Sequence, residues 1–224
     1  MIRNRRNRLT VSRAAAIVCL LTPLVASAQQ TRERSRTEGL RETERFIRAG
    51  DQTTAAVGTA KTEVERTLTA YNTLISQPSS DMRRDYRNLM RSVDSMNRRV
   101  TEASTRIGAM QAAADVFYQG RGLTIKGIQD KQLQSLAQQR MEQNQKDFDG
   151  VLAALREAGS ALEPLRKQLT DQITFLGSDL NPSATASLKP QAEKLNANGA
   201  AVFATTDAAI TKATNFFNAL RSQP

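Results

Sequence analysis

One long run of apolar residues constrains the fold of this chain more than any other feature. From residue 82 to residue 117, apolar residues recur at alternating spacings of four and three, without a miss. Only an α-helix with a single apolar stripe has that period. At 1.5 Å per residue the helix is roughly 54 Å long. The stripe consists of Met82, Tyr86, Leu89, Val93, Met96, Val100, Ala103, Ile107, Met110, Ala114 and Phe117.

A helix of this length needs neighbours of similar length, and three more stretches have the matching period. In the first, Val57, Val64 and Tyr71 repeat every seven residues, with Leu68 and Ile75 at the complementary offset. Moving back from Leu68 by seven residues at a time gives Lys61, Thr54, Ile47 and Leu40. Two of these four positions are polar, so the early part of this seam is weak. A third helix is expected to start near Asp130, and a last one near Pro190.

Short polar stretches separate these helices, at residues 77–80, 119–129 and 179–183. The simplest topology is up-down-up-down. The sequence therefore predicts an all-α fold, an elongated antiparallel bundle of about four long helices with coiled-coil heptads. Pro164 leaves one choice open. Either one helix bends at the proline, or Ser160 caps a new helix whose first turn contains it.

The N-terminal 28 residues have the organisation of a signal peptide. Five arginines precede an apolar run from Ala14 to Val25, and small residues follow at 26–28. This pattern predicts cleavage between Ala28 and Gln29, and hence an exported protein in the periplasm or another extracytoplasmic space. Residues 29–45 alternate in charge and are expected to be flexible. Residues 46–224 are expected to form a single helical-bundle domain.

The composition argues against most enzyme classes. The chain has no histidine, and its one cysteine, Cys19, lies within the predicted signal peptide. The commonest general base and the thiol nucleophile are therefore missing from the mature chain. We expect no catalytic residues, no metal site and no cofactor. Removal of five arginines leaves 27 basic and 22 acidic residues, so the mature net charge is +5 rather than +10.

Several stretches between Tyr71 and Phe217 resemble an uncharacterised family of exported bacterial helical proteins, known only as a domain of unknown function. The matching stretches are residues 71–75, 81–93, 152–155 with Pro164, and 180–188. The resemblance implies export and helices, and it brings no catalytic residues. After Phe117 the chain departs from the family, which tends to have an acidic, tryptophan-containing stretch where residues 118–122 read Tyr-Gln-Gly-Arg-Gly.

Four arginines form the most distinctive predicted surface, because they lie outside the apolar stripe on a common face of the second helix. They are Arg84, Arg87, Arg91 and Arg98. One interpretation is that they pair with acidic residues of the third helix. The other is that they contact a polyanion, such as lipid headgroups or an acidic envelope polymer.

Two functions follow as hypotheses. The first is a non-enzymatic, rod-like structural or adaptor module, whose partner is another envelope protein or a second copy of the chain. The second is a peripheral module that binds anionic lipid or an envelope polymer through the four arginines. Nucleic acid is not an expected partner, because export separates the protein from it.

Overall fold

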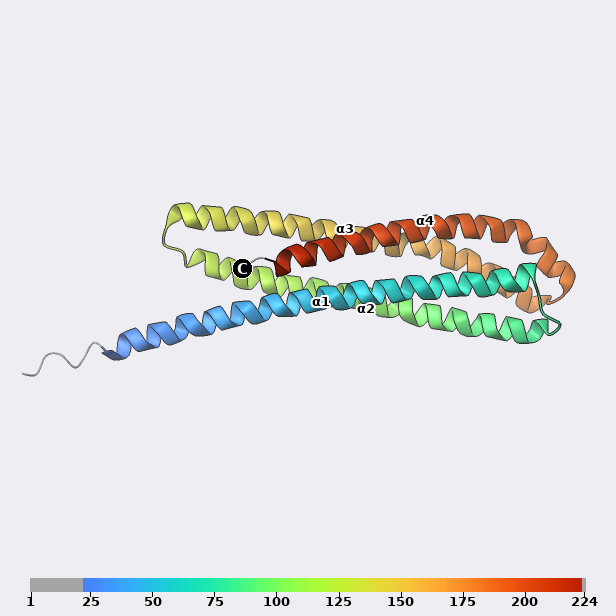
Figure 1. Ribbon diagram of the computed structural model, residues 1–224, viewed down its shortest axis with the longest axis horizontal. Helices are drawn as coiled ribbons and strands as arrows, with labels where there is room; N and C mark the ends of the chain where they lie inside the picture. Colours follow the sequence, from blue (N-terminus) through green and yellow to red (C-terminus); the bar gives the residue numbers. More distant parts are fainter. Residues whose placement is uncertain (1–21, 223–224) are drawn as a thin grey trace, which may run out of the picture. The chain divides into compact units, whose positions relative to one another are not determined.

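The computed structural model describes the backbone of residues 22–222 as four long α-helices (Figure 1). Helix α1 spans Thr22–Ser76, α2 spans Met82–Lys126, α3 spans Lys131–Ser178 and α4 spans Pro182–Arg221. The chain divides into two compact units after Leu40. In the second unit the four helices pack as an antiparallel bundle, which confirms the predicted fold class. Side chains are described from Glu38 onward.

The helix boundaries differ from the predictions at two places. Helix α2 continues past the glycines at 120 and 122, because Tyr118 and Ile125, seven residues apart, are both buried and extend its apolar face. Helix α4 begins at Pro182 and not near Pro190. The side chain of Asn181 accepts a hydrogen bond from the amide of residue 184 and caps the helix, so a proline in the first turn is well placed.

Helix α3 passes through Pro164 without ending, so the structure has one helix there and no new start at Ser160. The proline removes one hydrogen bond from the helix, the bond to the carbonyl of residue 160, which is exposed. Apolar burial holds the helix together on both sides of it. Leu165 and Ala158 are both buried in the core.

The core face of α1 begins earlier than the sequence predicted. Its buried positions alternate by four and three over nine sites: Phe46, Gly50, Thr53, Val57, Ala60, Val64, Thr67, Tyr71 and Leu74. The predicted positions Leu68 and Ile75 are both buried. Further back the core departs from that offset by one residue, because Ala60 lies in the core and the side chain of Lys61 is 20% exposed.

Two buried threonines of α1 explain why this seam was hard to find. The hydroxyl of Thr53 donates to the carbonyls of Ala49 and Arg106, and the hydroxyl of Thr67 donates to the carbonyl of Ser92. Moving 14 residues along α1 therefore moves 14 residues back along α2. Both hydroxyls are satisfied, so threonine is tolerated in the core and sets the antiparallel register.

Polar contacts set the register between α1 and α4 in the same way. Lys61 forms an ion pair with Asp207 at 2.8 Å, and near the C-terminus of α4 Arg221 pairs with Asp51 at 2.9 Å. The hydrogen bond that Lys61 donates to Asp207 is the largest of the effects that raise the pKa of Lys61. The first and last helices of the bundle are thus neighbours, and the four helices enclose one long core.

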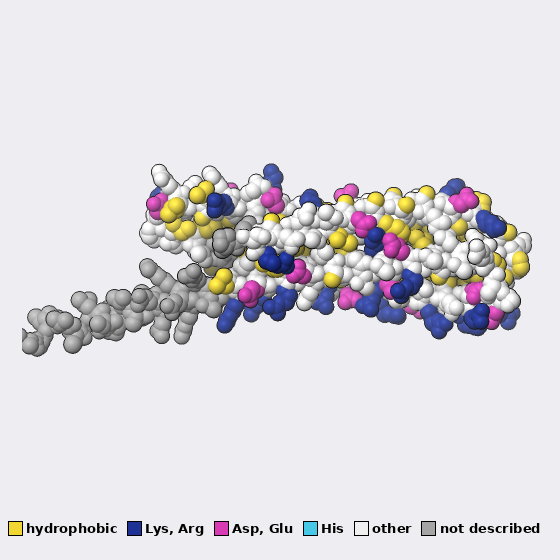
Figure 2. All heavy atoms as spheres, in the orientation of Figure 1, with side chains coloured by type: hydrophobic (Ala, Val, Ile, Leu, Met, Phe, Trp, Pro, Cys, Tyr) yellow, Lys and Arg dark blue, Asp and Glu magenta, His cyan; other side chains and the backbone are white. Residues whose placement is uncertain are grey.

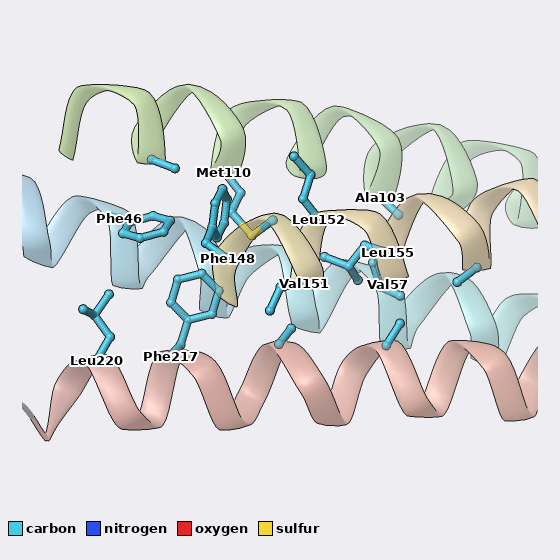
Figure 3. Packing of buried hydrophobic residues seen from close by; sticks show 14 of the residues in the cluster. Phe46, Val57, Ala103, Met110, Phe148, Val151, Leu152, Leu155, Phe217 and Leu220 are labelled. Carbon is cyan, nitrogen blue, oxygen red and sulfur yellow. The ribbon is translucent and has the colours of Figure 1, made fainter. Parts of the chain in front are cut away.

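The core consists of two clusters along the bundle. At one end, aromatic rings from α2, α3 and α4 surround Phe46 of α1, whose ring centroid lies 5.0 Å from that of Phe148 and 5.2 Å from that of Phe217 (Figure 3). Toward the other end the core is mainly aliphatic, around Leu89, Leu169 and Leu195. The few aromatic residues of the chain are therefore concentrated where they interlock.

The burial of individual side chains on α2 predicts which of its positions tolerate a charged residue. Met110 is fully buried, whereas Thr105 on the same helix is exposed. Met110→Asp places an unpaired charge in the core and should lower the melting temperature by about 10 °C or more. Thr105→Asp should change stability by no more than about 0.5 kcal/mol. Thermal unfolding followed by far-UV circular dichroism compares them, and equal melting temperatures would contradict the packing.

Candidate anion-binding surface on helix α2

The four predicted arginines lie on one face of α2 and are all exposed. They are Arg84, Arg87, Arg91 and Arg98. Their spacings of three, four and seven residues keep them within about a sixth of the helix circumference. Asp81 caps the N-terminus of the helix by accepting a hydrogen bond from the amide of Arg84 at 3.0 Å, so the first of these arginines lies in the first turn.

The neighbouring charges do not neutralise this face. From residue 82 to residue 106, α2 carries seven arginines and three acidic residues, a surplus of four positive charges. The three acids are Asp85, Asp94 and Glu102. Asp85 accepts a hydrogen bond from the Ser79 amide, and hydrogen bonds from Ser79 lower its pKa. Glu102 pairs with Arg99 at 2.8 Å. Asp94 alone lies among the four arginines.

No ion pair joins α2 to α3 among the described residues of the two helices. The two interhelical ion pairs described above connect α1 and α4 instead. Arg91 donates to Asn88 on its own helix, and Arg106 donates to Gln52 of α1 at 3.1 Å. The pairing of the arginines with the third helix, one of the two predicted interpretations, is therefore not what the structure contains.

Basic side chains follow the edge of the bundle formed by α2 (Figure 2). Acidic side chains do not gather along this edge and are spread over the face of the bundle shown in Figure 2. Among the described residues none of the four arginines forms an ion pair, and a row of exposed cations with a net positive surplus attracts anions, because their fields add. Such a surface can hold a multivalent anion.

Comparison with known proteins places the chain in a family. Residues 32–220 match the family model described as Protein of unknown function (DUF2959). The chain belongs to that family. The resemblance found in the sequence is thereby confirmed. No curated protein and no solved structure in the comparisons matches the chain.

The family match includes most of the segment that was expected to be flexible. Residues 29–45 lie within α1, whose backbone is helical from Thr22 onward. The predicted cleavage site, Ala28 and Gln29, also lies in this helix, and its side chains are outside the described residues, as is the whole of segment 1–21. No helix in the described part of the chain is long and apolar enough to cross a membrane.

One surface feature of this DUF2959 chain was missed by the sequence analysis. Apolar side chains are exposed where α2 leads into α3: Val116, Leu123, Leu133 and Leu136. Helix α4 ends at Arg221, short of this connection, so the start of α3 has no cover from it (Figure 1). In α3 the apolar residues Met141, Phe148 and Leu155 repeat every seven positions. Leu133 and Leu136 fall outside that repeat, and this offset was the available signal.

If the arginine face is free of structural partners, removing its charge should leave the bundle stable. We expect the quadruple Arg→Gln variant at residues 84, 87, 91 and 98 to melt within about 2 °C of the wild type. Helicity should be unchanged, because glutamine is a good helix former. Differential scanning calorimetry at low salt measures this. A marked drop in melting temperature would mean that the arginines stabilise the fold through contacts with other helices.

Proposed function

We propose that this protein is an exported, non-enzymatic helical module that binds an anionic surface of the cell envelope through the arginine face of α2. One observation carries the proposal: the four arginines are exposed and lack acidic partners on α3. The shared chemistry of the ligand is a dense array of phosphate or carboxylate groups. Lipid headgroups and acidic envelope polymers both present such an array.

The geometry of α2 supports a flat or extended ligand over a small one. The first and last of the four arginines are 14 residues apart, so they span roughly 21 Å along the helix. A single small anion cannot contact both ends of this row, whereas adjacent headgroups can. Each exposed cation near an anionic membrane contributes on the order of 1 kcal/mol to binding, so the four together give a measurable effect.

Vesicle co-sedimentation tests this function directly. Wild-type protein should sediment with vesicles rich in phosphatidylglycerol and remain in solution with pure phosphatidylcholine. Binding should weaken as salt rises, because exposed charges are screened over about 8 Å at physiological ionic strength. The quadruple Arg→Gln variant at residues 84, 87, 91 and 98 should lose most of this binding.

A matched variant controls for net charge. Four exposed basic residues of α3 are replaced by glutamine instead: Lys131, Arg140, Lys146 and Lys167. This variant loses the same charge from another helix and should still bind. Equal loss in both variants would mean that only net charge matters. If wild-type protein binds no anionic vesicles even at low salt, the lipid form of the proposal fails, and the same series with an acidic polymer tests the other form.

A second function, a rod-like structural or adaptor module for another envelope protein or a second copy of the chain, is favoured by the apolar residues at the α2–α3 connection. Leu123 is 71% exposed and Leu133 is 58% exposed, on either side of the connection between α2 and α3. Exposed apolar side chains are visible at this end of the bundle (Figure 2), and such groups often mark interaction sites. Protein interfaces commonly centre on such residues.

Self-association provides the test of this second function. If the connection joins two copies, wild-type protein should sediment as a dimer or larger species in analytical ultracentrifugation. Leu123→Ser combined with Leu133→Ser and Leu136→Ser should shift it to monomer while the melting temperature stays within about 2 °C, because all three side chains are exposed. An unchanged sedimentation coefficient in the triple variant would remove this surface from the self-association.

A further inference from the structure

A cleft of about 610 Å³ opens in the middle of the bundle, and all four helices line it. Its interior is mainly apolar and includes Val57 and Val64 from α1, Val100 from α2, and Val202 from α4. Sites for small molecules in proteins typically have volumes of about 300–1,000 Å³ and apolar walls with a few polar groups. The cleft has both properties.

A layer of small side chains creates this space. Ala60 of α1, Ala103 of α2, Ala158 of α3 and Thr206 of α4 are all buried and all line the cleft. The aromatic cluster packs on one side of the layer and the aliphatic cluster on the other. Bundle cores usually fill each layer with larger side chains, since interiors pack to nearly crystalline density. Here each helix contributes a small residue at the same level.

Two glycines widen the mouth of the cleft. Gly108 lies in the middle of α2 and Gly159 in the middle of α3, both are exposed, and both line the cleft. A Cβ atom added at either position would meet nothing within 4 Å. By contrast, a Cβ at Gly50 would collide with the ring of Phe217, and one at Gly199 would lie 2.9 Å from Leu68.

Close packing therefore favours glycine at residues 50 and 199, most strongly at 50, but not at 108 and 159. Glycine inside a helix is less stable than alanine, because it restricts the unfolded chain least. Neither the helical backbone nor a close neighbour explains why residues 108 and 159 are glycine and not alanine. What the two glycines do provide is access to the interior between α2 and α3.

The mouth of the cleft also contains an arginine, Arg156, whose charge is not paired with a carboxylate of the described residues. The guanidinium of Arg156 donates to the side-chain carbonyl of Gln111 at 2.8 Å, across the gap between α3 and α2. Among the described residues, Arg156 forms no ion pair. Glu163, the acid that lines the cleft, pairs with Arg166 at 3.5 Å. Lys61, which also lines it, is held by Asp207 and Glu65.

We propose that this cleft binds a single aliphatic chain ending in a carboxylate, such as a fatty acid. The chain would lie against the layer of small residues, and the carboxylate would accept hydrogen bonds from the free donors of Arg156. This site is separate from the arginine face of α2 and does not depend on the function proposed for it. It adds a lipid-binding activity that uses the interior of the bundle.

Isothermal titration calorimetry with decanoate and with 1-decanol tests the proposal, at concentrations below micelle formation. Wild-type protein should bind one decanoate and bind the neutral alcohol more weakly. Arg156→Gln should weaken decanoate binding about tenfold and leave decanol binding unchanged, because a charge-assisted hydrogen bond is lost. Gly108→Leu combined with Gly159→Leu should abolish binding of both, because the leucines fill the mouth. The Arg→Gln variant at residues 84, 87, 91 and 98 should bind decanoate as the wild type does.

Three results would overturn the proposal: no saturable heat with decanoate, unchanged binding in the leucine variant, or unchanged preference for decanoate in Arg156→Gln. If the leucine variant fails to fold by circular dichroism, wild-type protein labelled with ¹³C at alanine methyls provides the same test. The methyl signals of Ala60, Ala103 and Ala158 should shift on addition of decanoate. Signals that stay in place would show that the chain does not enter the cleft.

Discussion

Each helix of this bundle carries an apolar stripe along the part that packs against its neighbours, and covering those stripes determines most of how the four helices are arranged. The shortest of the helices, α4, has 40 residues, and an isolated amphipathic helix of that length leaves its whole stripe in water. Antiparallel neighbours of similar length remove the stripes from solvent together. Where the cover from α4 ends, at Arg221, the leucines of the α2–α3 connection remain exposed.

Apolar stripes alone do not determine how far one helix slides past the next, because a shift of seven residues restores a similar pattern. Directional contacts remove that ambiguity. The hydroxyls of Thr53 and Thr67 donate to α2, and the Lys61–Asp207 pair joins α1 to α4. The aromatic cluster around Phe46 adds a second restriction, because its rings come from all four helices and interlock only when those helices are aligned. Register therefore depends on few residues, while stability depends on many.

The sequence predicted the helices whose apolar repeat is regular. The prediction was weaker where a polar residue occupies a core position of the repeat. The stripe of α2 was read correctly because every position in it is apolar. The early seam of α1 was predicted to be weak because Thr53 occupies a core position, and its burial depends on a carbonyl group of another helix. Exposure of the four arginines of α2 followed from helical geometry, whereas the absence of partners on α3 required the relative placement of both helices.

The cleft could not be predicted from the sequence, because it also depends on the relative placement of the helices. Alanine and glycine are ordinary residues in long helices, and each one taken separately suggests only a thin seam. The cavity arises because the antiparallel register brings Ala60, Ala103 and Ala158 to one level. That alignment is a property of all the helices at once, and it appears only when their register is known.

Stability alone does not account for the arginine face or for the cleft. Like charges three or four residues apart on a helix, as at Arg84, Arg87 and Arg91, destabilise it by a few tenths of a kcal/mol per pair. Glycines with open space around them, at residues 108 and 159, also lower helix stability. The bundle places charges in pairs elsewhere, as at Lys61 and Asp207, and fills the core with large side chains elsewhere, as around Phe46, so both features could have been avoided. These two places are therefore where interactions outside the bundle are most reasonably sought.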